Sequence, residues 1–160
     1  MAHFRPAPRE LTFLLDEDVQ GLIDSAVWPR KRVKTLLDVD LPSGAADKDI
    51  VERAYERGLT IVTANREHFR KAIFDFQRRA RSGKCSCLYG LIALPSGKAT
   101  QERLLKSAGR RLRFAGRALT WKDVWRRNIE VRLPRTGEPL ISTLPPPCKL
   151  RGGHVPGDVR

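Results

Sequence analysis

The sequence is poor in cysteine, aromatic residues and long apolar runs. Its 160 residues include 3 Cys, 1 Met and 7% aromatic residues. No run approaches the ~20 apolar residues of a transmembrane helix, so we expect a cytoplasmic protein with no membrane contact. The chain has an odd number of cysteines, Cys85, Cys87 and Cys148, which excludes a simple disulfide framework. A zinc site with His154 stays open, although C-x-C spacing without a second pair is unlike most zinc ligand patterns.

Acidic residues are scarce in the second half of the chain. Residues 1–69 carry 10 Lys and Arg against 12 Asp and Glu, whereas residues 70–160 carry 21 against 6. The formal net charge is +13. Such asymmetry predicts a polyanionic partner, and nucleic acid is the leading candidate. The alternative is a basic protein whose arginines reflect composition alone.

The length and the 41% hydrophobic content predict one globular domain. We expect a flexible leader over residues 1–10, a folded domain over residues 11–144 and a disordered tail, rich in Pro and Gly, over residues 145–160.

Strand-like and helix-like segments alternate along the domain. This order predicts an α/β fold with a mostly parallel sheet, helices on both faces and a hairpin at the C-terminal edge. The expected strands are Leu11–Leu15, Val33–Val39, Leu59–Thr63, Leu88–Leu94 and the hairpin Ile129–Leu133 with Leu140–Leu144. The expected helices are Val19–Val27, Asp47–Arg57, one from Asn65 to about Arg79, Thr100–Arg113, and a short one capped by Thr120 and Asp123.

Acidic residues follow the first expected strand directly, as Asp16, Glu17 and Asp18. In a parallel α/β sheet, ligands bind at the carboxyl edge of the strands. Asp47 and Glu67 lie near the starts of later helices, so the topology can bring these acids to one place. Carboxylates gathered in a cationic protein indicate a metal-dependent site that acts on nucleic acid.

Three blocks of the sequence resemble the signature blocks of a bacterial PIN-like family, which is related to toxin nucleases of toxin–antitoxin pairs. The blocks are F-L-L-D-E-D-V from Phe13, A-D-K-D-I from Ala46 and I-V-T-A-N-R-E-H-F from Ile61. The resemblance covers about residues 11–95. It implies a PIN-like three-layer fold for the domain of residues 11–144 and a Mg²⁺- or Mn²⁺-dependent endoribonuclease, which could be the toxin of such a pair.

The resemblance also assigns the candidate catalytic residues. Asp16, Asp47 and Glu67 match the acids that hold the metal, Asn65 stands where the family has Asp, and His68 is an insertion. Metal ions suit this chemistry, because they neutralise the phosphate and activate water. As an alternative, Asp47 and Asn65 could be helix N-caps and Glu67 could complement a helix dipole. Asp18, where the family has Asn, could restore the charge missing at Asn65 or simply begin a solvated helix.

Basic residues of the second half offer a surface for RNA. Arginine phosphate clamps and nearby aromatic rings are typical of such surfaces, although each single arginine could be a solvated helix residue. The candidates are Arg78, Arg79, Arg81, Lys84, Arg110, Arg111 and Arg113.

Three functions remain open at this point. The first is the metal-dependent ribonuclease, with RNA, an antitoxin protein and a second copy of the chain as its candidate partners. The second is a catalytically impaired PIN-like module that binds RNA or protein, and the third is a basic structural or ribosome-associated protein.

Overall fold

The structure is a computed structural model that describes residues 10–79, 88–126 and 129–144. Most of the expected leader, the whole expected tail, all three cysteines and two predicted RNA-binding residues, Arg81 and Lys84, lie outside these residues. In the part that is described, no helix is both long and apolar enough to cross a membrane.

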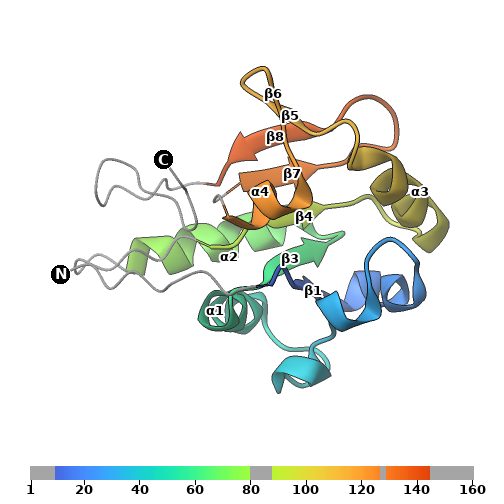
Figure 1. Ribbon diagram of the computed structural model, residues 1–160. Helices are drawn as coiled ribbons and strands as arrows, with labels where there is room; N and C mark the ends of the chain where they lie inside the picture. Colours follow the sequence, from blue (N-terminus) through green and yellow to red (C-terminus); the bar gives the residue numbers. More distant parts are fainter. Residues whose placement is uncertain (1–9, 80–87, 127–128, 145–160) are drawn as a thin grey trace.

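A six-stranded sheet forms the centre of the molecule, in the order β2-β1-β3-β4-β7-β8 (Figure 1). The first five strands run parallel, and β8 pairs antiparallel with β7 at the edge. These findings confirm the α/β class, the mostly parallel sheet and the edge hairpin. The strands are β1 Phe13–Leu15, β2 Val33–Lys34, β3 Thr60–Thr63, β4 Leu91–Ala93, β7 Ile129–Arg132 and β8 Leu140–Thr143.

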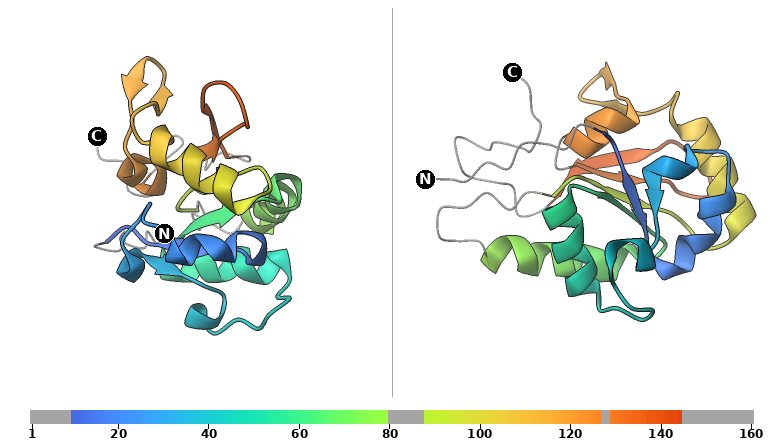
Figure 2. Two further views of the ribbon diagram at one scale, coloured as in Figure 1. Left: turned by 90° about the vertical axis from the view of Figure 1, so that its right-hand side faces the viewer. Right: turned by 60° about the horizontal axis from the view of Figure 1, so that its bottom comes forward.

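Successive side chains of each strand point to opposite faces of the sheet, where they pack in two hydrophobic clusters. Leu14 and Ile61 pack in one cluster with residues of α1 (Asp47–Arg57) and α2 (Arg66–Arg79). Their neighbours Leu15 and Val62 pack in the other, with the 3₁₀ helix η1, α3 and α4. Figure 2 shows η1 and α3 side by side. The bounds of these elements are η1 Glu17–Asp24, α3 Lys98–Ala108 and α4 Trp121–Arg126.

The predicted helix Val19–Val27 and the predicted strand Val33–Val39 need correction. The helical segment begins earlier, at Glu17, and is a 3₁₀ helix. The strand ends at Lys34, and another 3₁₀ helix, η3 (Leu37–Val39), follows it. Reciprocal hydrogen bonds between Thr35 and Asp38 start that turn, with the Thr35 N–H donating to Asp38 Oδ2 over 2.9 Å. This capping box overrides the β-branched composition of the segment.

The predicted helix Thr100–Arg113 also ends too late. Helix α3 stops at Ala108, and the chain forms a small hairpin of β5 (Arg113–Phe114) and β6 (Arg117–Ala118). Its turn residues Ala115 and Gly116 have φ angles of 52° and 79°. Two successive positive φ angles are typical of the tight turns that match strand twist. Arg110 therefore lies in the turn after α3, and Arg113 lies on a strand.

Candidate functional site

Asp16 leaves the carboxyl end of β1 and is held by the neighbouring strand. Its backbone N–H donates to the carbonyl of Val62 over 3.0 Å, which continues the pairing of β1 with β3. Its Oδ2 accepts a 3.0 Å hydrogen bond from the Thr63 hydroxyl, and its Oδ1 accepts one of 2.8 Å from the Glu17 N–H. The half-buried carboxylate is therefore fixed at the carboxyl edge of the sheet.

Asp18 returns to the same edge from the first turn of η1. Its Oδ1 accepts a 3.1 Å hydrogen bond from the Ala64 N–H. Partial burial of the carboxyl raises the pKa of Asp18 to about 6; the Ala64 N–H opposes this shift, and the adjacent Asp16 carboxyl adds to it. Asp16 and Asp18 thus form a close carboxyl pair in which a shared proton, or a cation, relieves repulsion.

Asp47 joins these two carboxyls from the start of α1. It is the first residue of the helix, and the N-cap is Ala46, which makes no side-chain cap bond. The alternative reading of Asp47 as an N-cap is therefore wrong. Burial and then the charge of Asp16 raise the pKa of Asp47, whereas His68 lowers it. We call Asp16, Asp18 and Asp47 the acid cluster.

Glu17 ties the loop before Asp47 to this cluster. Its carboxylate accepts hydrogen bonds from the Ser43 hydroxyl, over 3.3 Å, and from the Gly44 N–H. Gly44 has a φ of 74°, a conformation that glycine adopts without a Cβ penalty. The acidic residue between Asp16 and Asp18 thereby acts as a positioning residue for Asp47.

Asn65 and His68 lie at the border of the acid cluster. The Asn65 Nδ2 is 2.9 Å from Nδ1 of His68, and the same ring nitrogen is 3.9 Å from Oδ2 of Asp47. The Asn65 backbone N–H donates to the Thr63 hydroxyl over 2.9 Å, and that hydroxyl in turn holds Asp16. Asn65 therefore joins the site through its backbone and through the imidazole that it orients.

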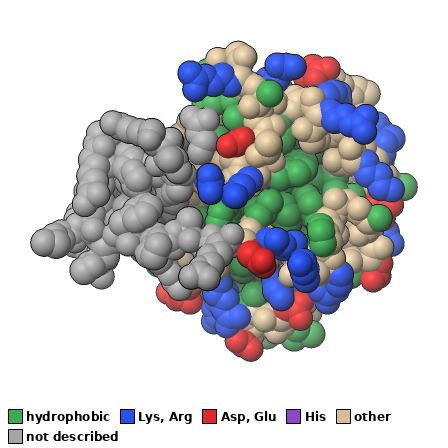
Figure 3. Space-filling view, in the orientation of Figure 1, with side chains coloured by type: hydrophobic (Ala, Val, Ile, Leu, Met, Phe, Trp, Pro, Cys, Tyr) green, Lys and Arg blue, Asp and Glu red, His purple; other side chains and the backbone are tan. Residues whose placement is uncertain are grey.

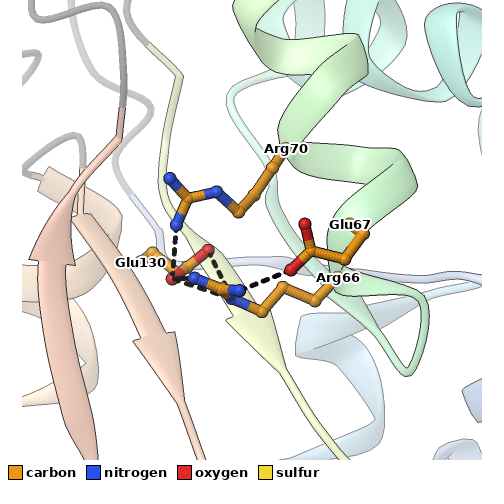
Figure 4. A network of polar contacts seen from close by, with 4 residues as sticks. All are labelled: Arg66, Glu67, Arg70 and Glu130. Atoms are coloured by element: carbon orange, nitrogen blue, oxygen red, sulfur yellow. Dashed lines mark hydrogen bonds and ion pairs between the residues drawn. The ribbon is translucent and has the colours of Figure 1, made fainter.

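Glu67 lies elsewhere. Its side chain is 78% exposed and pairs with Arg66 over 2.6 Å. Arg66 also binds Glu130, which is 2% exposed and contacts Arg70 at 3.4 Å (Figure 4). The structure thus joins Glu67 to an arginine network between α2 and β7. Our sequence analysis missed Glu130, although a carboxylate between two apolar residues of a strand is a signal for a buried ion pair.

The acid cluster fits a hydrated ion better than an ion enclosed by protein. Among the described residues, no group of three or more His, Cys, Asp and Glu is arranged to hold a metal. Magnesium, however, usually keeps several waters and takes one or two carboxylates. Burial first, and then the charge of Asp16, raises the pKa values of Asp18 and Asp47, so ionised carboxylates here are favoured by a nearby cation. Hard oxygen donors with excess negative charge suit Mg²⁺ or Mn²⁺.

Two hollows adjoin the acid cluster. One, of about 850 Å³, runs along α2 and begins at Asp47 and His68. We call it the α2 groove; it is lined by Asp47, Lys48, His68, Lys71, Ala72, Asp75, Arg78 and Arg79. The other, of about 450 Å³, reaches the cluster through Ala64, whose N–H binds Asp18, and is also lined by Glu67 and by Arg132 at the end of β7. Of the acid cluster, only Asp47 lines either hollow, and it lines the α2 groove.

The predicted RNA-binding residues fall into separate places. Arg78 and Arg79 line the α2 groove, whereas Arg110 and Arg111 line another hollow, of about 720 Å³, along α3. Arg113 lies on the β5–β6 hairpin. Figure 3 shows Lys and Arg side chains around a central hydrophobic area on one face. The basic residues are thus dispersed, and only the first pair lines a hollow that also contains an acid of the cluster.

Comparisons with known proteins returned no match: no family model, no curated protein and no solved structure is significantly similar to this chain.

Proposed function

We propose that the protein is a metal-dependent endoribonuclease with a PIN-like three-layer fold, as the three sequence blocks imply. The observation that carries the proposal is the convergence of Asp16, Asp18 and Asp47 at the carboxyl edge of the parallel sheet. That edge is the usual ligand site of such folds. The relation to toxins, with an antitoxin protein as partner, is part of the proposal and rests on the resemblance alone.

The proposed roles differ in one respect from those that the sequence implies. Asp16 and Asp47 hold a hydrated Mg²⁺ or Mn²⁺, and Asp18, beside Asp16, is the nearby third acid in place of Glu67, because Glu67 is engaged by Arg66. When bound, the ion would neutralise the phosphodiester and activate the attacking water. Thr63 and the Ala64 N–H keep the carboxylates aimed at this place.

A catalytically impaired PIN-like module that binds RNA or protein is the second candidate. It is favoured by the neutral amide at Asn65 and by the ion pair that engages Glu67. Both features remove negative charge from the positions where the resemblance implies acids. The two candidates differ in whether the remaining three carboxylates are enough for catalysis.

Cleavage of single-stranded RNA with Mn²⁺ tests the proposal. We expect Asp16→Asn to reduce cleavage by at least about 100-fold, because it removes the central metal carboxylate. Asp24→Asn is the matched control, since it removes an exposed acid from the other end of η1. Cleavage that persists in Asp16→Asn, or in EDTA, would contradict a metal-dependent nuclease. Absence of cleavage by the wild-type protein would favour the binding module.

A further inference from the structure

The α2 groove connects the acid cluster with the far end of α2. Asp47 and His68 line one part of it, and Arg78 and Arg79 line another, near the helix C-terminus. The rise of an α-helix places these two ends about 16 Å apart. The groove is therefore long enough to hold several units of a polymer whose next unit lies at the carboxylates.

The α2 groove is lined by four cations and by two acids, Asp47 and Asp75. Lys48, Lys71, Arg78 and Arg79 are exposed, and none of them forms an ion pair within the described residues. Other described cations differ in this respect: Arg111 pairs with Glu138, whereas Lys106 and Arg110, which line the hollow along α3, form no ion pair within the described residues. Because these four cations outnumber the two acids of the lining, Asp47 and Asp75, the groove carries a net positive charge that attracts anions.

An aromatic ring stands beside the same row of cations. Phe74 is 38% exposed, which is unusual for a large apolar side chain in this molecule. The Arg78 guanidinium lies 5.4 Å from the centre of its ring. Exposed aromatic rings and guanidinium planes are surfaces on which unpaired bases stack. The pair therefore favours single-stranded nucleic acid over a duplex or an acidic protein.

We propose that the α2 groove binds one strand of RNA and leads it to the acid cluster. Lys48, Lys71 and Arg78 contact successive phosphates, and Phe74 stacks on a base. The identity of the strand as a substrate rests on the proposed function, whereas its binding does not. The hollow along α3 does not serve this path, because no residue of the acid cluster lines it.

Salt dependence of binding tests the path. The probe is a fluorescein-labelled 12-nucleotide oligouridylate, followed by anisotropy in EDTA between about 50 and 200 mM salt. We expect the triple variant Lys48→Gln, Lys71→Gln, Arg78→Gln to flatten the log–log slope by about 2, since each lost phosphate contact removes about 0.7. The control variant Lys106→Gln, Arg117→Gln, Lys122→Gln loses the same charge from exposed positions on α3, β6 and α4 and should keep the wild-type slope.

A second variant tests the stacking. Phe74→Leu should weaken binding about tenfold with an unchanged salt slope, because stacking contributes affinity without releasing counterions. The proposed RNA path would be wrong if both triple variants flattened the log–log salt slope equally. It would also be wrong if the wild-type protein did not bind the probe. Mn²⁺-dependent cleavage that survives such a result would leave the nuclease standing. The expected slopes without any cleavage would keep the path and remove the nuclease.

Discussion

At the scale of single residues, Asp18 is the clearest addition to the site. In the sequence alone, Asp18 could be an ordinary acid in the first turn of a helix. The structure sets it against the Ala64 N–H and beside Asp16, and its pKa rises from 3.8 to about 6. This raised pKa means that the Asp18 carboxyl is protonated more easily in the folded protein than in the unfolded chain.

This shift predicts how stability depends on pH in the absence of metal. Because the folded state holds the Asp18 proton up to about pH 6, the free energy of unfolding should fall as pH rises from about 4 to 6, then level off. Exposure and solvent screening limit the change to about 1 kcal/mol. Asp18→Asn should reduce this slope, leaving the part that the raised pKa of Asp47 contributes, and raise the Tm at pH 7.5 by roughly 3 °C. The test is the Tm of both proteins measured from pH 4 to 8. A Tm difference that stays constant over this range would contradict the prediction.

Asn65 provides a second test at this scale. Asn65→Asp restores the acid that the family resemblance implies and adds a negative charge near Asp16 and Asp47. If Asn65 belongs to the metal site, the change should tighten Mn²⁺ binding, measured by calorimetry, by about tenfold. Asn65→Ser, which keeps a short polar side chain without charge, is the control. Equal Mn²⁺ affinity in all three proteins would leave Asn65 with its contact to His68 alone.

At the scale of elements, Glu130 joins α2 to β7. It faces Arg66 and Arg70 across the two elements and is nearly fully buried. Removing one partner of a buried ion pair leaves the others without compensation, which is more costly than the pair itself is favourable. The network therefore fixes how α2, which also lines the proposed RNA path, sits on the sheet.

We expect Glu130→Gln to lower the free energy of unfolding by about 3 kcal/mol, because it strips two partly buried arginines of their counterion. Urea denaturation at constant ionic strength measures the change. Glu138→Gln is the control, since its pair with Arg111 is largely exposed and such pairs contribute at most about 1 kcal/mol. Similar losses in both variants would show that burial of Glu130 carries no special weight.

The elements also show where sequence patterns were sufficient. Helix α1 ends as predicted, because Gly58, with a φ of 69°, acts locally, whereas its start differs in that Asp47 is the first helical residue and not the N-cap. The strand expected at Val33–Val39 stops at Lys34, because hydrogen bonds between Thr35 and Asp38 start a turn. Strand β4 begins later than expected, after Gly90, where a Cβ would lie 2.6 Å from the carbonyl oxygen of Val124.

At the scale of the whole molecule, charge and topology act together. The acids of the first half and the cations of the second half meet where α2 starts at the carboxyl edge of the sheet and runs away from it. The net charge of +13 by itself predicts only a polyanionic partner. The placement of unpaired cations beside the acid cluster indicates a direction for that partner, from the α2 groove to the carboxylates.

The sequence alone determined the parallel α/β class, the edge hairpin and the position of Asp16 after β1, because apolar periodicity and turn residues act locally. Only the tertiary structure decided which acids meet. Glu67 pairs with its neighbour Arg66 because Glu130, 64 residues further along the chain, holds that arginine. Asp18 joins Asp16 because the pairing of β1 with β3 brings the Ala64 N–H to it. Such contacts depend on strand order and register, which join residues that no local pattern relates.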